Sequence, residues 1–483
     1  MVEVQKRIIR DLQGIPTSRQ GASQSSQPQK RYSKSEREKI KLYIFLEQIR
    51  IDGLINTVQQ ESSIDKKQSR TFFSIFLTYF MIYFCLGILP PNITNITESL
   101  PLATSSGFGI VIALNLLIGM VIMIVLGYFG GLVLIKVPRK TLFLGMNMIW
   151  VCCYGLLSVV SNFNQFLILV AFGALGVGSF LPLGFSIVSD LFSPEQRGAK
   201  FGMMHIALVL GNGCGMLFGS VLGNIGSGTG WRLAYCTAAV IGVFPLLGFF
   251  FFGTNPRRKP DEYSFYTYKL EVKEALAMLK KKSIVGILGT VLGSWIAMST
   301  LATWSIFFLN SEFGNNSIAT LLFLVAGLGA LPGAIIGGKL GDRQYKIEKG
   351  HTRIKISFLG VVHGIICFIF FYLFPFLFFF GILGYFLTAF SIGNQFALYS
   401  EVTTPKLRST INALNGIMMN TGGIIGNLLI SSLIRENIAL LQIALLFVLI
   451  IWAVSSFLWI FPYLFYGRDT IKYSKSKTQL KYS

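Results

Sequence analysis

Ionisable side chains inside long apolar stretches are the residues of this sequence with the clearest capacity for chemistry. His205 and His363 are both flanked by apolar residues, and an imidazole in such a setting could carry a proton near neutral pH. The alternative, which we favour for each, is a neutral histidine that donates a hydrogen bond to a backbone carbonyl. Four acidic residues lie at the ends of apolar stretches, where interface or loop-clamping roles are typical: Glu98, Asp190, Glu312 and Glu401.

Signatures of catalysis and of a bound cofactor are missing from the 483 residues. The sequence contains no Walker A loop, no cluster of metal ligands and no catalytic triad. Its six cysteines lie inside apolar runs without CxxC spacing, which is typical of packing residues: Cys85, Cys152, Cys153, Cys214, Cys236 and Cys367. We therefore expect a protein that is not an enzyme and that holds no resident cofactor or metal.

The composition indicates that lipid surrounds most of the chain. Hydrophobic residues make up 53% of the sequence and charged residues 13%, against about 25% charged residues in ordinary soluble proteins. A mean hydropathy of +0.62 with 43 Phe cannot be hidden within one globular core, because much of a folded chain of this size lies at its surface.

Helices that cross a bilayer are predicted from the apolar runs. A hydrocarbon core of roughly 30 Å needs about 20 apolar residues in helical conformation. Twelve such runs, bounded by charged residues or by Gly and Pro, predict an all-α membrane protein. They lie at 72–97, 106–135, 141–160, 164–191, 199–224, 231–253, 284–310, 317–341, 353–374, 376–402, 408–434 and 438–466.

Positive charge is distributed unevenly between the predicted loops. The net charge is +21, and 40 of the 42 Lys and Arg fall on one side of the twelve runs, with only Arg232 and Arg435 on the other. Because Lys and Arg favour cytoplasmic loops, we expect both termini in the cytoplasm and the protein in the plasma membrane. The basic excess is thereby explained without nucleic acid, which we do not expect as a partner.

The two halves of the chain repeat one another. Ser189-Asp190, Pro194 and Arg197 recur as Ser400-Glu401, Pro405 and Arg408, always 211 residues later. The same offset carries Gly211 onto Gly422 and Gly215 onto Gly426, and Gly131 with Lys136 and Arg139 echoes Gly338 with Asp342 and Arg343. Repeats of this kind place a substrate site near the midplane, where the two six-helix halves meet.

The expected organisation has five segments. A basic cytoplasmic segment at 1–70 is partly disordered and carries an amphipathic helix near 36–56, which either lies on the inner leaflet or packs against the loops. The first six-helix half spans 71–254, a cytoplasmic linker 255–283, the second half 284–466 and a basic tail 467–483. We expect a monomer whose partners are the lipid bilayer and a small amphipathic or hydrophobic substrate.

The loop Gly338-Lys339-Leu340-Gly341-Asp342-Arg343 resembles the G-x-x-x-D-R signature of the major facilitator superfamily. The resemblance implies that Asp342 and Arg343 tie helix ends together and help to hold one conformation. In the first-half copy the Asp position is Ile135, which leaves a basic remnant that could equally be topological charge. The gate residues expected from the repeats and the resemblance are Gly131, Arg139, Asp190, Arg197, Gly338, Asp342, Arg343, Glu401 and Arg408.

Further motifs narrow the resemblance. They are Leu77-Thr78-Tyr79-Phe80-Met81-Ile82 ending in Gly87-Ile88-Leu89-Pro90, the run 189–198, and Gly230-Trp231-Arg232. Within the superfamily the chain is most similar to the Spinster-like lipid transporters. That family carries charges in spans 1 and 4 that are implicated in proton coupling, and these positions align here with Met81, Ile82, Phe172 and Ser179. Because the whole charge set is absent, we expect facilitated movement that is uncoupled from protons, or coupling to an ion that the sequence does not identify.

The predicted cavity is built from uncharged polar groups and aromatic rings. An amide inside hydrocarbon is costly unless it is paired, so it usually points inward, and for about half of the candidates a bond to a neighbouring helix is the alternative. The candidates are Tyr79, Tyr83, Asn115, Ser179, Asn212, Trp295, Ser299, Trp304, Asn394, Gln395 and Asn415. They favour a carrier for an amphipathic or lipid-like molecule; the alternatives are an exporter of small hydrophobic, drug-like solutes and a transport-dead membrane sensor or scaffold.

Overall fold

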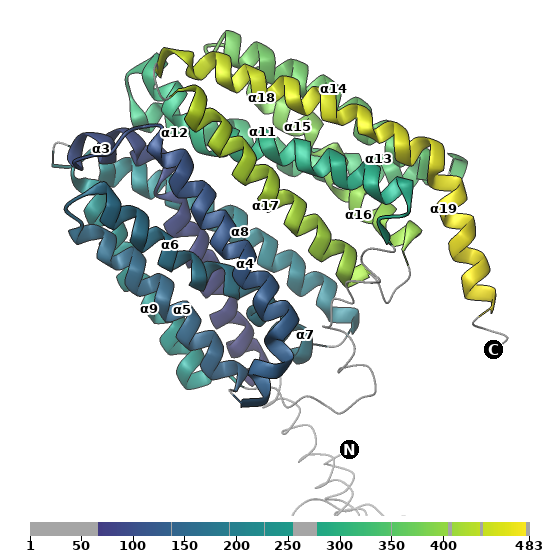
Figure 1. Cartoon of the computed structure of the whole chain (residues 1–483), viewed down its shortest axis with the longest axis horizontal. Coiled ribbons are helices and arrows are strands. Elements are labelled where there is room, and N and C mark those ends of the chain that lie inside the picture. Colours follow the sequence, from purple (N-terminus) through teal and green to yellow (C-terminus); the bar gives the residue numbers. More distant parts are fainter. Residues whose placement is uncertain are drawn as a thin grey trace, which may run out of the picture. The chain divides into compact units, whose positions relative to one another are not determined.

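The computed structural model describes residues 66–136, 138–192, 194–226, 228–254, 278–348, 350–403, 408–434 and 438–479 (Figure 1). The chain divides into two units, Met1–Ile64 and Asp65–Ser483, and every helix labelled in Figure 1 belongs to the second unit. The predicted amphipathic helix at 36–56 and most of the predicted linker at 255–283 lie outside the described residues.

The first half contains the helices that correspond to predicted spans 1 to 6. A first helix at 66–87 leads through a short turn into two small helical segments. The elements that follow it are η1 (Pro90–Asn92), α3 (Ile93–Ser99), α4 (Gly107–Lys136), α5 (Arg139–Leu156), η2 (Leu157–Val159), α6 (Phe163–Phe180), the π-helical segment η3 (Leu181–Phe185), α7 (Ser186–Leu191), α8 (Pro194–Gly223) and α9 (Gly230–Phe252).

The second half repeats this order, except that its second and fourth crossings are each divided into two helices, α12 with α13 and α15 with α16. Its elements are α11 (Lys282–Phe313), α12 (Asn316–Leu328), α13 (Ala330–Glu348), α14 (Gly350–Leu373), α15 (Phe379–Thr388), α16 (Phe390–Val402), α17 (Arg408–Leu433), η5 (Ile438–Leu440), α18 (Leu441–Ser456), η6 (Phe457–Trp459) and α19 (Ile460–Gln479). No strand occurs among the described residues, so the predicted all-α class is confirmed.

Eleven helical stretches in the described part of the chain are long and apolar enough to cross a membrane. The predicted tenth crossing, at 376–402, is a pair of shorter helices, α15 and α16, that meet at Ala389. Together with this pair the stretches form the twelve-helix arrangement expected from the sequence. The last helix differs from its prediction, because it continues past residue 466 to Gln479.

Short polar turns separate the helices at one end of the bundle. The Asn162 side chain accepts a hydrogen bond from the Gln165 N–H at 3.0 Å and caps α6. Asn315 caps α12 in the same way through the Ile318 N–H at 3.0 Å. Gly314, with φ +63°, ends α11 in a left-handed conformation that glycine adopts without steric cost. The starts of α6 and α12 and the end of α11 therefore lie where the sequence changes between apolar residues and Asn or Gly.

Repeated glycines bring equivalent helices together in the two halves. A Cβ added at Gly211 or Gly215 of α8 would lie 2.4 Å from the carbonyl oxygen of Phe80 or 2.0 Å from that of Phe84. In α17, a Cβ at Gly422 or Gly426 would lie 2.5 Å or 2.2 Å from carbonyl oxygens of α11. The 211-residue offset thus corresponds to the same close helix contact in both halves, of the kind that small residues permit.

The two halves meet mainly through α4 and α17, which lie side by side, and through α8 and α12 (Figure 1). We call the end of the bundle that carries Arg139, Asp190, Arg353 and Glu401 the basic end, and the other end the opposite end.

Many large apolar side chains on the outer faces of the helices are exposed, including Phe244 and Phe251. Such a surface is stable when lipid, and not water, covers it.

Candidate substrate cavity and gates

A cavity of about 140 Å³, which we call the central cavity, lies where the two halves meet. Its lining comes from the first helix, α4, α6, η3 and α17: Tyr79, Ile82, Tyr83, Leu86, Asn115, Leu116, Gly119, Met120, Met123, Val177, Gly178, Leu181 and Asn420. The first-helix residues follow the spacing i, i+3, i+4 and i+7, which places them on one helical face. One continuous stripe of the first helix therefore forms a wall of the central cavity.

The polar groups of the central cavity are two phenols and two amides. The Asn115 Nδ2 donates to the Tyr154 hydroxyl at 3.0 Å, which holds the amide in place. The Tyr79 ring stacks on Phe180 with centroids 4.5 Å apart and meets Tyr83 edge-on at 5.0 Å. Asn420 is the lining residue contributed by the second half. No side chain in this lining is charged.

Glycine and methionine shape the rest of the wall. A Cβ at Gly178 of α6 would lie 2.3 Å from the Gly119 carbonyl oxygen of α4, so the two helices touch through their backbones. Met120 and Met123 follow on the same helix as Gly119 and line the central cavity. Methionine is flexible and polarisable, so these side chains can adapt to apolar groups of different shapes.

The structure brings together only part of the residue set predicted for the substrate site. Tyr79, Tyr83 and Asn115 line the central cavity. Ser179 is buried and donates to the Gly176 carbonyl of its own helix at 2.7 Å. Asn212 of α8 is half-buried and does not contribute to the lining, and Trp295 is 37% exposed and also lies outside it.

Two further predicted residues, Ser299 and Trp304, bind Asn427 of α17. The Trp304 Nε1 donates to the Asn427 Oδ1 at 3.1 Å, and the Asn427 Nδ2 donates to the Ser299 Oγ at 3.0 Å. Trp304 and Asn427 are both fully buried. Sequence reasoning missed Asn427, although it lies seven residues after Asn420 and hence on the same face of α17.

The remaining predicted residues lie nearer the basic end of the second half. Gln395 and Tyr399 of α16 both donate to the Asn415 Oδ1 of α17, at 2.7 and 3.0 Å. Asn394 is fully buried and donates to the Gly337 carbonyl at 3.1 Å. The amide side chains of Asn394, Gln395 and Asn415 join helices of one half, and none of them lines the central cavity.

The positions aligned with the missing charges of span 4 do not face the central cavity. Phe172 is 56% exposed on the outer surface, and Ser179 points into the contact with its own helix. The cavity face of this span is formed by Val177, Gly178 and Leu181. Phe172 and Ser179 therefore do not contribute to the cavity wall, and the part of this span that does is also uncharged.

Neither candidate proton carrier lines the central cavity. His205 and His363 are both exposed. The His363 Nδ1 lies 2.8 Å from the Leu359 carbonyl oxygen, one turn earlier in α14. A carbonyl only accepts, so this nitrogen donates, as in the structural interpretation of the residue.

At the basic end each half contains one arginine clamp. In the first half, Arg139 at the start of α5 forms an ion pair with Asp190 of α7. In the second half, Arg353 of α14 lies 2.7 Å from an Asp342 oxygen and 3.3 Å from a Glu401 oxygen. Arg139 and Arg353 thus occupy equivalent positions near the start of the third helix of each half.

The second-half clamp has two further partners. The Tyr466 hydroxyl donates to Glu401 at 2.6 Å, and the Arg353 Nη1 donates to the Asn394 Oδ1 at 3.3 Å. Arg353 was not among the gate residues predicted from the sequence, which named Asp342 and Arg343 of the signature. Arg343 is exposed, and the partner that the structure gives Asp342 is Arg353.

For four other predicted gate residues, Gly131, Arg197, Gly338 and Arg408, the described part of the structure gives no contact that bears on a gate role. A Cβ at Gly338 would have no atom within 4 Å, so packing does not require glycine there. The surroundings of Gly131, Arg197 and Arg408 lie outside the part of the chain whose side chains are described.

At the opposite end, hydrogen bonds join the two halves directly. The Asn316 Nδ2 donates to the Pro91 carbonyl at 2.6 Å, and the Asn224 Nδ2 donates to the Ser317 hydroxyl at 3.1 Å. Ser431 likewise donates to the Ser106 carbonyl. The ion pairs of the described basic end each stay within one half. The halves are therefore bonded together at the opposite end, while the basic-end clamps hold each half separately.

Two helical halves that are bonded at one end and enclose an uncharged cavity define a membrane transport protein. A sequence model of the Major Facilitator Superfamily matches residues 71–427, and the chain belongs to this superfamily. It is an integral multi-pass membrane protein.

The chain is also similar in sequence to bacterial transport proteins, over part of their length. The chain is 26% identical over 207 residues to the uncharacterized MFS-type transporter YfhI of Bacillus subtilis (strain 168), covering 43% of this chain and 49% of that protein. It is 28% identical over 173 residues to the inner membrane transport protein YdhP of Escherichia coli (strain K12), covering 35% of this chain and 41% of that protein. The chain thus aligns with about half the length, or less, of these relatives.

Among solved structures, the crystal structure of a bacterial homologue of the human lysosomal transporter Spinster, inward-facing and unoccupied, has the same fold. It superposes with a TM-score of 0.68 over 83% of this chain and 98% of the other, at 16% sequence identity. The structural likeness agrees with the Spinster resemblance that the sequence motifs predicted.

Proposed function

We propose that the protein is a secondary carrier that moves an amphipathic, lipid-like small molecule by alternating access and without proton coupling. The observation that carries the proposal is the central cavity between the halves, whose lining combines apolar and methionine side chains with two phenols and two amides and has no charge. Such a wall suits an apolar tail with a modest polar head, because each amide or hydroxyl can pair with one polar group of the ligand.

The size of the central cavity limits what it can enclose. Sites for drug-sized ligands measure about 300–1,000 Å³, and this cavity measures about 140 Å³. In this conformation it can hold only part of an amphiphile, so the rest of the molecule must extend beyond it. A ligand with one polar head and one long tail meets that condition better than a compact polar solute such as a sugar.

The chemistry of the lining supports proton-independent movement. Proton-driven carriers use ionisable groups inside the membrane, where such groups are costly and therefore functional. Neither a carboxylate nor an imidazole lines the central cavity. We also propose that the basic end faces the cytoplasm, since the loops that the sequence predicts on that side hold most of its Lys and Arg. This orientation places the hydrogen-bonded opposite end outside.

Flux into proteoliposomes tests the proposal. The purified protein is reconstituted and offered labelled single-chain amphiphiles and neutral drug-like solutes. Leu86→Trp would fill the central cavity and Tyr83→Phe would remove one lining hydroxyl, whereas Thr237→Val removes a hydroxyl that is exposed on α9 and bonds only to its own helix. We expect amphiphile flux that falls at least tenfold in Leu86→Trp, that falls in Tyr83→Phe, and that is unchanged in Thr237→Val.

The possible results separate the alternatives. Flux of the drug-like solutes alone, blocked by Leu86→Trp, would replace the amphiphile by a small hydrophobic substrate. Flux that ignores Leu86→Trp would show that the central cavity is not the path. No flux of any compound, with folded protein in every vesicle preparation, would favour a sensor or scaffold.

A further inference from the structure

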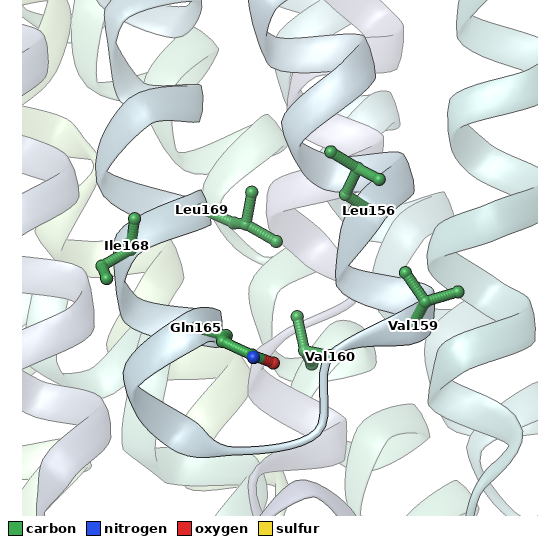
Figure 2. Close-up of a pocket in the computed structure, with 6 residues that line it drawn as sticks. All are labelled: Leu156, Val159, Val160, Gln165, Ile168 and Leu169. Carbon is green, nitrogen blue, oxygen red and sulfur yellow. The ribbon is translucent and has the colours of Figure 1, made fainter.

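A second hollow, larger than the central cavity, lies on the outer surface of the first half at the opposite end. It measures about 280 Å³ and lies between the end of α5, η2 and the start of α6. Figure 2 shows Leu156 and Val159 on one wall facing Ile168 and Leu169 on the other, with Val160 and Gln165 near the turn. We call these six residues the elbow groove. It shares no residue with the central cavity.

The elbow groove is apolar and open to the surroundings of the protein. Val159 is 70% exposed, and Leu156 and Ile168 are each 51% exposed. The groove runs from the turn at Val160 along the 3-10 segment Leu157–Val159 to Leu156 at the end of α5. A groove with this orientation on a membrane-spanning helix pair lies beside the acyl chains of the bilayer.

A cation lies directly behind the turn that closes the groove. The Arg232 Nη1 donates to the Val160 carbonyl at 2.7 Å and to the Ser158 carbonyl at 3.2 Å. Its guanidinium carbon lies 4.5 Å from the centroid of the Trp231 ring. Within the described ranges, Arg232 is the one Lys or Arg at the opposite end of the bundle. The charged side chain that contacts the turn at the groove is therefore a cation. The exposed carboxylate Glu98 lies at the same end, next to Ser99, whose hydroxyl accepts from the Trp231 Nε1 at 2.9 Å.

Gln165 supplies a polar group at the mouth of the groove. Its Oε1 accepts from the Ser161 N–H at 2.8 Å, which fixes the side chain across the turn and leaves the amide N–H groups to donate. The groove thus presents an apolar trough, an amide donor from Gln165 at the end near the turn, and the guanidinium of Arg232 beside that end. This order of groups matches the acyl chain, ester and phosphate of a glycerophospholipid.

We propose that the elbow groove binds one anionic phospholipid of the surrounding bilayer. An acyl segment occupies the trough between Leu156 and Ile168, the Gln165 amide donates to an ester oxygen, and the phosphate pairs with Arg232. A volume of 280 Å³ is slightly below that of a drug-sized site, so it accommodates part of one chain and leaves the remainder in the bilayer. The single cation makes the site selective for net negative headgroups.

Native mass spectrometry of the full-length protein tests the proposal. The protein is equilibrated with equal amounts of phosphatidylglycerol and phosphatidylcholine of the same acyl chains, and the retained lipid is counted. One basic side chain near the membrane surface contributes about 1 kcal/mol toward an anionic lipid, which is about a fivefold preference. We expect one retained lipid with that preference for phosphatidylglycerol.

Four variants locate the site. Leu156→Trp fills the trough and should remove the retained lipid, whereas Val240→Trp, at a 57% exposed position of α9, should not. Arg232→Gln should abolish the headgroup preference and Arg232→Lys should keep it. If Arg232→Gln does not fold, the preference of the unaltered protein must fall as salt is raised, because screening weakens the contact.

Two results would overturn the proposal. Equal retention of both lipids by the unaltered protein would remove the role of Arg232, and retention by Leu156→Trp at the level of Val240→Trp would remove the groove. Neither result depends on substrate flux, so the proposed transport function is tested separately.

Discussion

Replacing Gly426 by Ala should destabilise the second half, because the added methyl group would clash with α11. The added Cβ would lie 2.2 Å from the Ile296 carbonyl oxygen and 2.4 Å from the Thr300 Oγ1 of α11. Ordinary contacts begin near 3.4 Å, so α11 and α17 would have to separate by about 1 Å, against the close packing of the bundle. Overpacking of this kind lowers the free energy of unfolding by about 1–3 kcal/mol. The higher helix propensity of Ala raises it by up to about 1 kcal/mol. With about 1 kcal/mol of helix propensity subtracted, the expected net loss is up to about 2 kcal/mol.

The matched control is Gly416→Ala in the same helix. There the nearest atom to the new Cβ is the flexible Met123 Cε at 4.0 Å, so the helix propensity of Ala should leave stability unchanged or slightly higher. Tryptophan fluorescence during heating, in one detergent and at one scan rate, compares both variants with the unaltered protein. A transition temperature of Gly426→Ala equal to that of Gly416→Ala would refute the steric reasoning.

Other features of the structure give three further predictions. Arg353→Gln should destabilise the protein by up to about 3 kcal/mol in thermal unfolding, because the largely buried Glu401 loses its cation. Asp342→Asn, at an exposed carboxylate, should cost less than about 1 kcal/mol; equal losses would contradict the assigned burial. Asn427→Leu should cost about 1–3 kcal/mol, because it leaves the buried Trp304 N–H without an acceptor, and a variant as stable as the unaltered protein would count against that bond. A pH gradient imposed across proteoliposomes should not drive substrate accumulation, and uphill uptake in response to the gradient would disprove proton-independent transport.

The buried positions of Trp304 and Asn394 determine which variants are informative about flux. Both side chains are fully buried and bonded to neighbouring helices, so truncating either would disturb packing along with any effect on transport. Tyr83, Asn115 and Asn420 line the central cavity. Substitutions at these three positions report on the substrate path more directly.

Features that depend on local sequence were predicted well. The crossings follow from the length of each apolar run, because a helix rises a fixed distance per residue and the bilayer has a fixed thickness. The repeat was visible because Gly211 and Gly215 recur as Gly422 and Gly426, and both pairs make the same backbone contact. The break at Ala389 was not predicted, since no charged residue, Gly or Pro lies between Phe386 and Ile392 to mark it.

By itself, the sequence determined that this is an all-α protein of two repeated halves that crosses the membrane about twelve times. The tertiary structure decided which faces and partners these helices use: Val177 and Gly178 face the central cavity where Phe172 does not, and Asp342 pairs with Arg353 of α14. The physical reason is that hydropathy reports how long a helix stays in lipid, whereas its rotation depends on packing against other helices. One residue changes the direction of a side chain by about 100°, so residues that are neighbours in the sequence can face a cavity, another helix or the bilayer.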